Sequence, residues 1–320
     1  MKLSVIIPTM NKVALLEKTL DALSVQDMAP GDEWEIVVVN DGSTDDTGAF
    51  LESRQGTGGA SLVVVAPPAN VGRAKARNLG ARAARGTWIL FLDDDIVAPP
   101  GLLRAHLALL ERNPGCGVIG YAVTDPDLVD APHFHYLDSR GVARLQPGPA
   151  PGRYFVTQNA SVPRSAFLEV GGFDEEFSTY GFEDMELAFR LEEEAGVGFL
   201  ALAAPVPHHV HHHTLTQYLD KKIESGRYSL PHLARLHPAR IREMNLHYVV
   251  DAQGQPGLTF MGHLLRWITG SWVGRGLPGL MAVWPVRANH RPWWPSFYFR
   301  MMSLTVLSCF HQGMTETSGQ

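Results

Sequence analysis

Cysteine is scarce in this sequence, with only Cys116 and Cys309 among 320 residues. Two thiols cannot make a disulfide framework, and their spacing is not that of a metal site. Reduced thiols are typical of a reducing compartment, so we expect a cytoplasmic protein without redox chemistry.

Long hydrophobic runs and clustered positive charge are also lacking. No uninterrupted apolar run reaches the roughly 20 residues that cross a bilayer, and the apolar start at residues 1–8 is too short for a secretory signal. Lys and Arg number 27 against 33 Asp and Glu, which gives a formal net charge of −6. Nucleic acid is therefore not an expected partner, because binding to its backbone needs a clustered basic face.

What the chain does contain is an alternation of β-branched runs with helical patterns. Four short apolar runs predict strands, at residues 3–8, 35–39, 62–65 and 88–92. A helix that runs through Arg73, Arg77 and Leu79 is expected, with Asn70 as its N-cap and Gly86 as its stop. The alternation predicts an α/β fold with a Rossmann-like, mainly parallel sheet flanked by helices. Ligands of such sheets bind beyond the carboxyl ends of the strands.

The second half of the chain has a weaker pattern. Residues 125–153 are rich in Pro, Gly and His, which predicts an irregular connection or a boundary between half-domains. Beyond them we expect a helix over 183–195, a strand over 197–203 and a helix over 215–223.

Three adjacent carboxylates, Asp93, Asp94 and Asp95, follow the predicted strand at 88–92. Like charges placed together repel one another unless a cation neutralises them. Carboxylate oxygens suit Mg²⁺ or Mn²⁺, ions that commonly bind a substrate diphosphate as well. The residues indicate a metal site, and a solvated acidic turn would explain them equally well.

Other polar groups lie at comparable positions. Asp41 follows the second predicted strand, where an Asx turn alone would account for it. Arg73 and Arg77 are four residues apart on a predicted helix, a spacing that suits phosphate binding and is also common on solvated faces.

Two further segments carry side chains of the types used in catalysis or metal binding. Glu183 and Asp184 begin a predicted helix after Gly181, where the helix dipole favours ionised carboxylates, as proton acceptors or as ordinary helix stabilisers. Residues 208–213 contain five histidines, of which one or two would complete a coordination sphere begun by the aspartates.

The order and spacing of these segments resemble those of the inverting family 2 glycosyltransferases, which have the GT-A fold. The resemblance covers residues 3–227 and leaves the remaining tail unmatched. It rests on SVIIPTMN at 4–11, VNDGSTD at 39–45, NVG at 70–72 with ARN at 76–78, FLDDD at 91–95, GGFD at 171–174, and EDMEL at 183–187 with Arg190.

This resemblance implies roles for the matched residues. Nucleotide binding falls to Pro8, Thr9, Asn11, Asp41, Asn70, Arg77 and Asp93. Asp41 would accept a hydrogen bond from the base. Asp93 and Asp95 would be the DxD carboxylates that hold Mn²⁺ or Mg²⁺, with His209 as the favoured histidine ligand and His211 as the second choice. Asp184 would be the general base, and Glu183 would bind the acceptor.

The implied activity is transfer of a sugar, with inversion, from a nucleoside diphosphate sugar to a saccharide or lipid-linked acceptor. The product would be a polysaccharide, a glycolipid or another glycoconjugate. A UDP-sugar is the default donor, and GDP- and dTDP-sugars stay open. One alternative is a sugar-nucleotide nucleotidyltransferase, although the Gly-rich, Arg-containing loop usual there is missing after the first strand. Another is a non-catalytic metal- or sugar-binding protein. A dehydrogenase is disfavoured, because the glycines of residues 56–59 precede a strand instead of joining a strand to a helix.

We expect a transferase domain over 1–230, with a nucleotide-sugar half at 1–124 and an acceptor half at 125–230, and a helical extension over 231–320. Residues 258–320 hold five arginines, no lysine, one acid and five of the seven tryptophans, which gives a formal charge of +4 against −10 for the remainder. This composition suits peripheral contact with the inner face of a membrane. A helical subdomain packed on the core or in a homodimer would explain it as well.

Overall fold

The computed structural model describes residues 1–56, 60–128, 131–204, 206–211, 213–251, 257–282 and 294–317. Contacts divide the chain into two compact units. Unit 1 comprises residues 1–129, 138–178 and 187–212, and unit 2 comprises residues 130–137, 179–186 and 213–320. The domain boundary that we expect at residue 230 stays a prediction.

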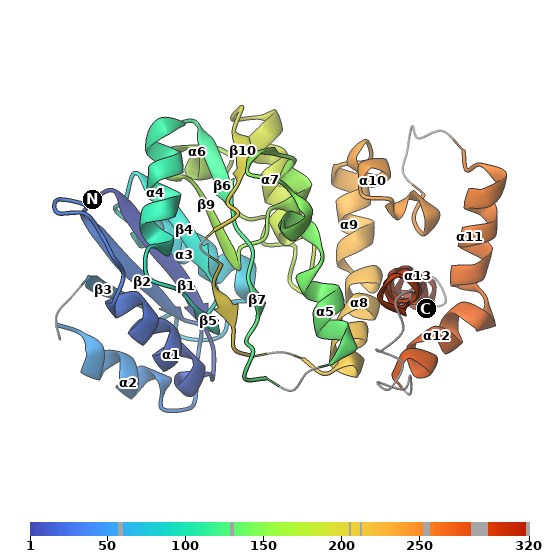
Figure 1. The fold of residues 1–320 in the computed structure, drawn as a ribbon, viewed down its shortest axis with the longest axis horizontal. Coiled ribbons are helices and arrows are strands. Elements are labelled where there is room, and N and C mark those ends of the chain that lie inside the picture. The colour runs from blue at the N-terminus through green and yellow to red at the C-terminus, as the bar shows by residue number, and fades with distance from the viewer. Residues whose placement is uncertain are drawn as a thin grey trace. The chain divides into compact units, whose positions relative to one another are not determined.

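Unit 1 is built on an eight-stranded sheet with the order β3-β2-β1-β4-β9-β6-β10-β8, whose central strands lie side by side in Figure 1. The strands are β1 (Leu3–Thr9), β2 (Trp34–Asn40), β3 (Ser61–Val65), β4 (Trp88–Leu92), β6 (Cys116–Ile119), β8 (Gly148–Ala150), β9 (Asn159–Pro163) and β10 (Gly198–Ala201). Strands β1 to β4 pair in parallel, as do β6 and β10. Strand β9 runs antiparallel between β4 and β6. The predicted α/β fold with a mainly parallel sheet is confirmed.

Helices cover both faces of this sheet. They are α1 (Val13–Ser24), α2 (Thr47–Arg54), α3 (Arg73–Ala83), α4 (Leu102–Arg112), α6 (Arg164–Glu169) and α7 (Glu183–Glu193). Val5 and Ile7 of β1 pack with α1 and α4, whereas Ile6 between them packs with α3, α6 and α7. Each fully buried side chain of this size contributes roughly 1.5–3 kcal/mol. Two apolar cores, one on each face of the sheet, therefore hold the strands in place.

The predicted start of α3 is wrong. Gly72, not Asn70, is its N-cap residue, and no side chain of the cap residue bonds the helix. The carboxylate of Asp41 accepts hydrogen bonds from the backbone N–H groups of Val71, at 2.7 Å, and Gly72, at 3.1 Å. Asp41, which is distant in sequence, thus satisfies backbone N–H groups at the helix start that the side chain of a local N-cap residue usually satisfies.

The predicted stop of α3 is also wrong. The helix ends at Ala83, where Ala84 turns into an extended backbone. Gly86 serves close packing instead, because a Cβ there would lie 2.6 Å from the backbone nitrogen of Ser4 and 2.7 Å from the carbonyl oxygen of Trp88.

The segment 125–153 is more regular than expected. It contains α5 (Pro132–Asp138), two short 3₁₀ helices (Gly141–Arg144 and Gly152–Tyr154) and the edge strand β8. The predicted helix over 183–195 is α7, and the strand over 197–203 is the shorter β10. Short elements of this kind take their stability from long-range contacts, which local composition does not reveal.

Unit 2 is helical where it is described, as the predicted extension requires. Its main helices are α8 (Leu215–Arg227), α9 (Ser229–Leu236), α10 (Arg240–Glu243), α11 (Phe260–Gly270), α12 (Trp272–Ala282) and α13 (Trp294–Thr317). A capping box of Thr214 and Gln217 begins α8. Within the described ranges, no helix has the length and apolarity needed to cross a membrane. Trp284, Trp293, Arg287 and Arg291 lie outside the described residues.

Helices α8 and α13 approach each other at two glycines. A Cβ on Gly226 would overlap the Phe310 backbone, and a Cβ on Gly313 would overlap the Ile223 carbonyl oxygen and approach the Arg227 nitrogen to 2.6 Å. The obstacles are backbone atoms, so a larger residue would force the helices apart.

We therefore expect Gly313→Ala to lower the free energy of unfolding by about 1–3 kcal/mol, the usual cost of overpacking. Gly276→Ala in α12 is the matched control, because a Cβ there meets nothing within 4 Å. It should raise stability by about 0.5–1 kcal/mol through helix propensity. Denaturant unfolding of both variants tests the contact, and equal effects would contradict it.

His106 of α4 is fully buried between two polar partners. Its Nδ1 lies 2.8 Å from Ser161 Oγ, and its Nε2 lies 2.9 Å from Asn159 Oδ1. Because that amide oxygen only accepts, Nε2–H donates to it, and Nδ1 accepts from the serine hydroxyl. Burial lowers the pKa of His106 to about 4, so the ring is neutral in the folded protein at pH 7.

The unfolded chain should bind a proton on this residue near pH 6.5, well above the folded-state value of about 4. Stability contributed by His106 is therefore present above pH 6.5 and is lost as the pH falls toward 4. Over this range, we expect His106→Gln to lose less unfolding free energy than the wild type, by up to about 3 kcal/mol. The exposed His135→Gln is the control, and a pH slope for His106→Gln equal to that of the wild type would refute the assignment.

Candidate functional site

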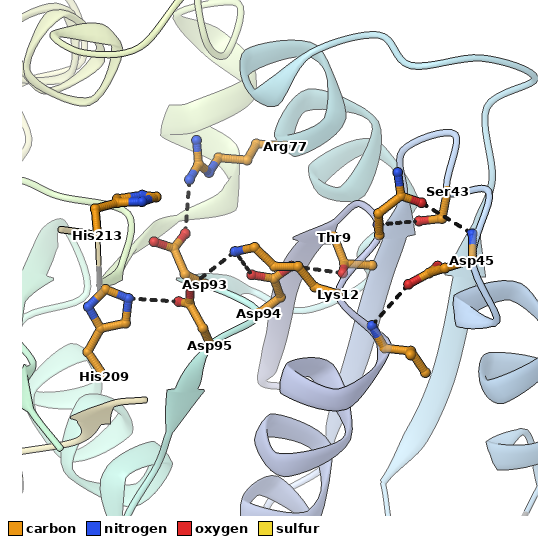
Figure 2. A network of polar contacts seen from close by, with 12 residues as sticks. Thr9, Lys12, Ser43, Asp45, Arg77, Asp93, Asp94, Asp95, His209 and His213 are labelled. Carbon is orange, nitrogen blue, oxygen red and sulfur yellow. Dashed lines mark hydrogen bonds and ion pairs between the residues drawn. The ribbon is translucent and has the colours of Figure 1, made fainter. Parts of the chain in front are cut away.

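Strand β4 delivers Asp93, Asp94 and Asp95 to the carboxyl end of the sheet. Asp93 Oδ1 accepts a hydrogen bond from Arg77 at 3.1 Å. Lys12 Nζ donates to Asp94 at 2.8 Å and to Asp95 at 3.0 Å. In Figure 2, Lys12 lies on one side of these carboxylates and His209 approaches Asp95 from the other. Each of the three carboxylates thus contacts a basic side chain: Asp93 contacts Arg77, Asp94 contacts Lys12, and Asp95 contacts both Lys12 and His209.

The middle aspartate is held from β1. Asp94 is 5% exposed and accepts hydrogen bonds from Thr9 Oγ1, at 2.8 Å, and from Lys12 Nζ. Burial raises the pKa of Asp94 to about 6, and Lys12 opposes that rise. Burial would lower the pKa of Lys12, but Asp94 and Asp95 raise it above its ordinary value, so the ammonium stays charged.

Asp95 is held by two basic groups. Its Oδ1 lies 3.1 Å from His209 Nε2, and its Oδ2 accepts from Lys12. Burial alone would raise the pKa of Asp95, but the contacts with His209 and Lys12 hold it well below its usual range. An ionised carboxylate beside an imidazole nitrogen is a donor pair for a divalent ion.

A small second sheet brings His209 to this position. Strand β11 (His208–His209) lies between β5 (Ile96–Val97) and β7 (Val123–Thr124). His209 stands opposite Ile96 in the antiparallel pair, and the Val210 N–H donates to the Asp95 carbonyl oxygen at 2.9 Å. His211, the second candidate, follows β11 outside this pairing.

The pair of Asp95 and His209 fits an octahedral metal. Among the described residues, no group of three or more His, Cys, Asp or Glu is arranged as a cation cage. Mg²⁺ binds its ligands at roughly 2.0–2.1 Å, so neighbouring ligands of an octahedron lie about 3 Å apart. The separation of 3.1 Å between Asp95 Oδ1 and His209 Nε2 matches this edge. Such ions commonly take few protein ligands and complete their shell with water and substrate phosphates.

Asp41 connects the β2 end to the start of α3. Beside its two bonds from the backbone of Val71 and Gly72, its Oδ2 accepts from Asn70 Nδ2 at 3.2 Å. A carboxylate offers about four lone-pair positions. Three are used by described residues, none of which takes the second position on Oδ1.

Asn11 ties the β1 end to the loop after β2. Its backbone has a positive φ of 54°, which asparagine tolerates, and its Oδ1 accepts from the Thr44 N–H at 2.7 Å. Its own N–H donates to Ser43 Oγ at 3.0 Å. Pro8 is paired in register with Val39 one step inside the sheet. These two residues shape the loops around the strand ends.

Arg77 is anchored by the Gly-Gly-Phe segment. Its guanidinium carbon lies 5.8 Å from the centre of the Phe173 ring, and its side chain is 6% exposed. The neighbouring Asn78 clamps the same segment, donating to the Phe173 carbonyl oxygen at 3.0 Å and accepting from the Phe173 N–H at 2.8 Å. The GGFD segment therefore positions a cation beside Asp93.

The Glu183–Asp184 pair begins α7 and belongs to unit 2. Gly181 and Phe182 before it both have positive φ, of 102° and 71°, which is costly for an aromatic residue. The ring of Phe182 lies 5.5 Å from that of Phe310, and Ser225 Oγ donates to the Tyr180 carbonyl oxygen at 2.6 Å. Helices α8 and α13 thus hold the turn that sets the first residues of α7.

Comparison with known proteins identifies the family to which this chain belongs. The model described as Glycosyl transferase family 2 matches residues 4–171, and the model described as Glycosyl transferase family group 2 matches residues 88–312. The chain belongs to glycosyl transferase family 2.

Related proteins match part of the sequence of this chain. Validoxylamine A glucosyltransferase from Streptomyces hygroscopicus subsp. limoneus is 34% identical over 222 residues, which cover 59% of this chain and 47% of that protein. The chain thus spans about half the length of the validoxylamine A glucosyltransferases that it matches.

Two solved structures show the same fold. S. aureus TarS 1-349 in complex with UDP has a TM-score of 0.55 at 17% identity, covering 100% of this chain and 92% of that one. The mannosyltransferase PcManGT from Pyrobaculum calidifontis, in complex with GDP-Man and Mn2+, has a TM-score of 0.59 at 20% identity, covering 98% and 86%. The expected GT-A fold is confirmed.

Some contacts of this family 2 chain escape sequence reasoning. Lys12 is the clearest, because it directly follows the matched segment 4–11 and its partners are more than 80 residues away. The only indication of Lys12 in the sequence is its place among the polar residues that follow the first strand. Phe182 carries no signal, since nothing local marks an aromatic residue for a positive φ.

Lys12→Met tests the charge balance of the family 2 site. Removing the ammonium leaves two buried carboxylates short of a donor, so we expect the free energy of unfolding to fall by about 1–3 kcal/mol. The more negative site should also attract cations more strongly, so Mn²⁺ should raise the melting temperature of the variant more than that of the wild type. Lys18→Met on the exposed side of α1 is the control, and matching responses of the two variants would contradict the role of Lys12.

Proposed function

We propose that this chain is a metal-dependent, inverting glycosyltransferase that uses a nucleoside diphosphate sugar. The observation that carries the proposal is the pair of Asp95 and His209, whose donor atoms lie 3.1 Å apart at the carboxyl end of the parallel sheet. Membership of family 2 supports the reaction type, and the Mn2+ in the complex of the Pyrobaculum mannosyltransferase supports a divalent ion. Asp95 and His209 would hold Mn²⁺ or Mg²⁺, with Asp93 beside them.

A UDP-sugar is the proposed donor. The solved relatives include a complex with UDP and one with GDP-Man, so both bases occur on this fold. The second position on Asp41 Oδ1 would accept a base N–H, and Arg77 beside Asp93 supplies positive charge for the donor. Thr9, Asn70 and the Asn11 loop would complete the nucleotide site.

The proposed chemistry is a single displacement. Asp184 accepts the proton of the acceptor hydroxyl as its oxygen bonds to the anomeric carbon, while the bond from that carbon to the diphosphate oxygen breaks. Attack from the face opposite the leaving group inverts the anomeric centre. A divalent ion held by Asp95 and His209 would supply positive charge to neutralise the departing nucleoside diphosphate. Glu183 positions the acceptor.

The proposed acceptor is a saccharide or a lipid-linked sugar, and the product is a polysaccharide, a glycolipid or another glycoconjugate. Cys116 and Cys309 are both free thiols, which agrees with a cytoplasmic reaction. A homodimer is a further proposal, which sedimentation would test.

Two substitutions separate metal binding from proton transfer. Asp184→Asn should bind UDP with Mn²⁺ within about twofold of the wild type and lower turnover about 10²–10⁴-fold, because only the base is lost. Asp95→Ala should lose the Mn²⁺-dependent part of UDP binding. Calorimetry measures the binding, and release of UDP from UDP-glucose measures the turnover.

Asp220→Asn, on the exposed side of α8, is the control for a lost negative charge. If Asp184→Asn turns over substrate at the wild-type rate, the assignment of Asp184 as the general base is wrong. If UDP binds the wild type equally well with and without Mn²⁺, the metal site is wrong.

A further inference from the structure

The consecutive helices α11 and α12 expose an unusually apolar surface. We call it the α11–α12 face; it comprises Phe260, Met261, Leu264, Trp267, Trp272, Val273 and Leu280. Phe260 is 84% exposed, Trp272 83%, Trp267 64% and Met261 59%. Single exposed apolar residues are ordinary, whereas a contiguous group of large ones marks an interaction site.

The spacing of these residues places them on one side of each helix. Phe260, Leu264 and Trp267 follow the i, i+4, i+7 pattern of a helical stripe. The opposite side is used for packing, since Thr269 of α11 and Leu277 and Met281 of α12 are buried. Both helices contact α13, so the face lies on a supported scaffold.

Tryptophans flank the corner between the two helices. Ser271 has an extended backbone, with φ −82° and ψ 173°, and so ends α11 just before Trp272 begins α12. Trp267 and Trp272 stand on either side of this break. Tryptophan prefers the depth of lipid headgroups, where its ring is partly apolar and its N–H is hydrated.

Within the segment that carries the face, Lys, Arg, Asp and Glu are represented by arginine alone. Residues 257–282 contain Arg266 and Arg275 and no Asp, Glu or Lys. Arg266 donates to Asp251 at 2.7 Å and to the His247 carbonyl oxygen at 2.8 Å, so its charge is engaged within unit 2. Arg275 is exposed on α12, between Trp272 and Leu280 in the chain.

We propose that the α11–α12 face docks on an anionic lipid bilayer, with the aromatic rings at headgroup depth and Arg275 against lipid phosphates. A second copy of the chain would fit less well. In a twofold contact the face meets itself, which brings two Arg275 side chains together, and residues 257–282 contribute no Asp or Glu to pair with them. An anionic bilayer supplies both an apolar layer and the opposite charge.

Flotation with vesicles tests this docking on the full chain. We expect the wild type to float with vesicles of phosphatidylglycerol and phosphatidylcholine and to dissociate as salt is raised. Trp272→Ser and Trp267→Ser should each weaken binding about tenfold, and Arg275→Glu at least about fivefold. The matched controls are Tyr228→Ser, at a 52% exposed aromatic residue outside the face, and Lys18→Glu for charge, and both should bind like the wild type.

Bromine-labelled lipids add a readout of depth, because they quench tryptophans at the bilayer surface. Quenching in the wild type and its reduction in Trp272→Ser would support the proposal. Absence of vesicle binding, or equal binding by face and control variants, would overturn it. Concentration-dependent dimers that Trp272→Ser dissociates, without vesicle binding, would assign the face to a second copy instead.

The proposal is separable from the transferase function. UDP binding with Mn²⁺ should be unchanged in Trp272→Ser, because the face lies outside the residues assigned to the donor. Loss of vesicle binding with intact UDP binding would therefore concern the face alone.

Discussion

Repulsion among Asp93, Asp94 and Asp95 is the constraint on which the site depends. Adjacent carboxylates at the end of a buried strand are stable only with compensating charge, because the low dielectric there strengthens every uncompensated interaction. Arg77 and Lys12 provide that positive charge, and His209 contacts Asp95 from the small sheet. The ends of β1 and β4 and helix α3 are thereby held together by charge as well as by the apolar cores.

This arrangement also prepares the site for a divalent ion. The Lys12 ammonium already holds the Asp95 carboxylate through Oδ2, so little freedom of this side chain is left to lose when Oδ1 binds the ion. Asp94 has no role in the metal proposal, yet its contacts with Thr9 and Lys12 attach β1 to β4. The middle residue of the acidic triplet thus serves the geometry of its neighbours.

The parallel half of the sheet is predictable because strands buried on both faces appear as continuous β-branched runs. The acidic strand end is predictable once the strand is recognised, because ligands bind beyond the carboxyl ends of parallel strands. The position of His209 beside Asp95 depends on the register of β11 against β5 and β7, and the pairing with β5 joins residues more than 110 positions apart. Asp41 as the cap of α3 is likewise long-range, which is why local rules favoured Asn70.

Charge distribution links the acidic site to the proposed lipid contact. The tail from residue 258 carries +4 and the rest of the chain −10. An anionic surface attracts the first and repels the second, and both forces act within about 8 Å at physiological salt. Apolar insertion of the α11–α12 face acts only at contact, so charge selects the part of the chain that approaches before the aromatic residues hold it there. The two effects favour the same region and act at different distances, so the arginines guide the approach and the tryptophans hold the contact.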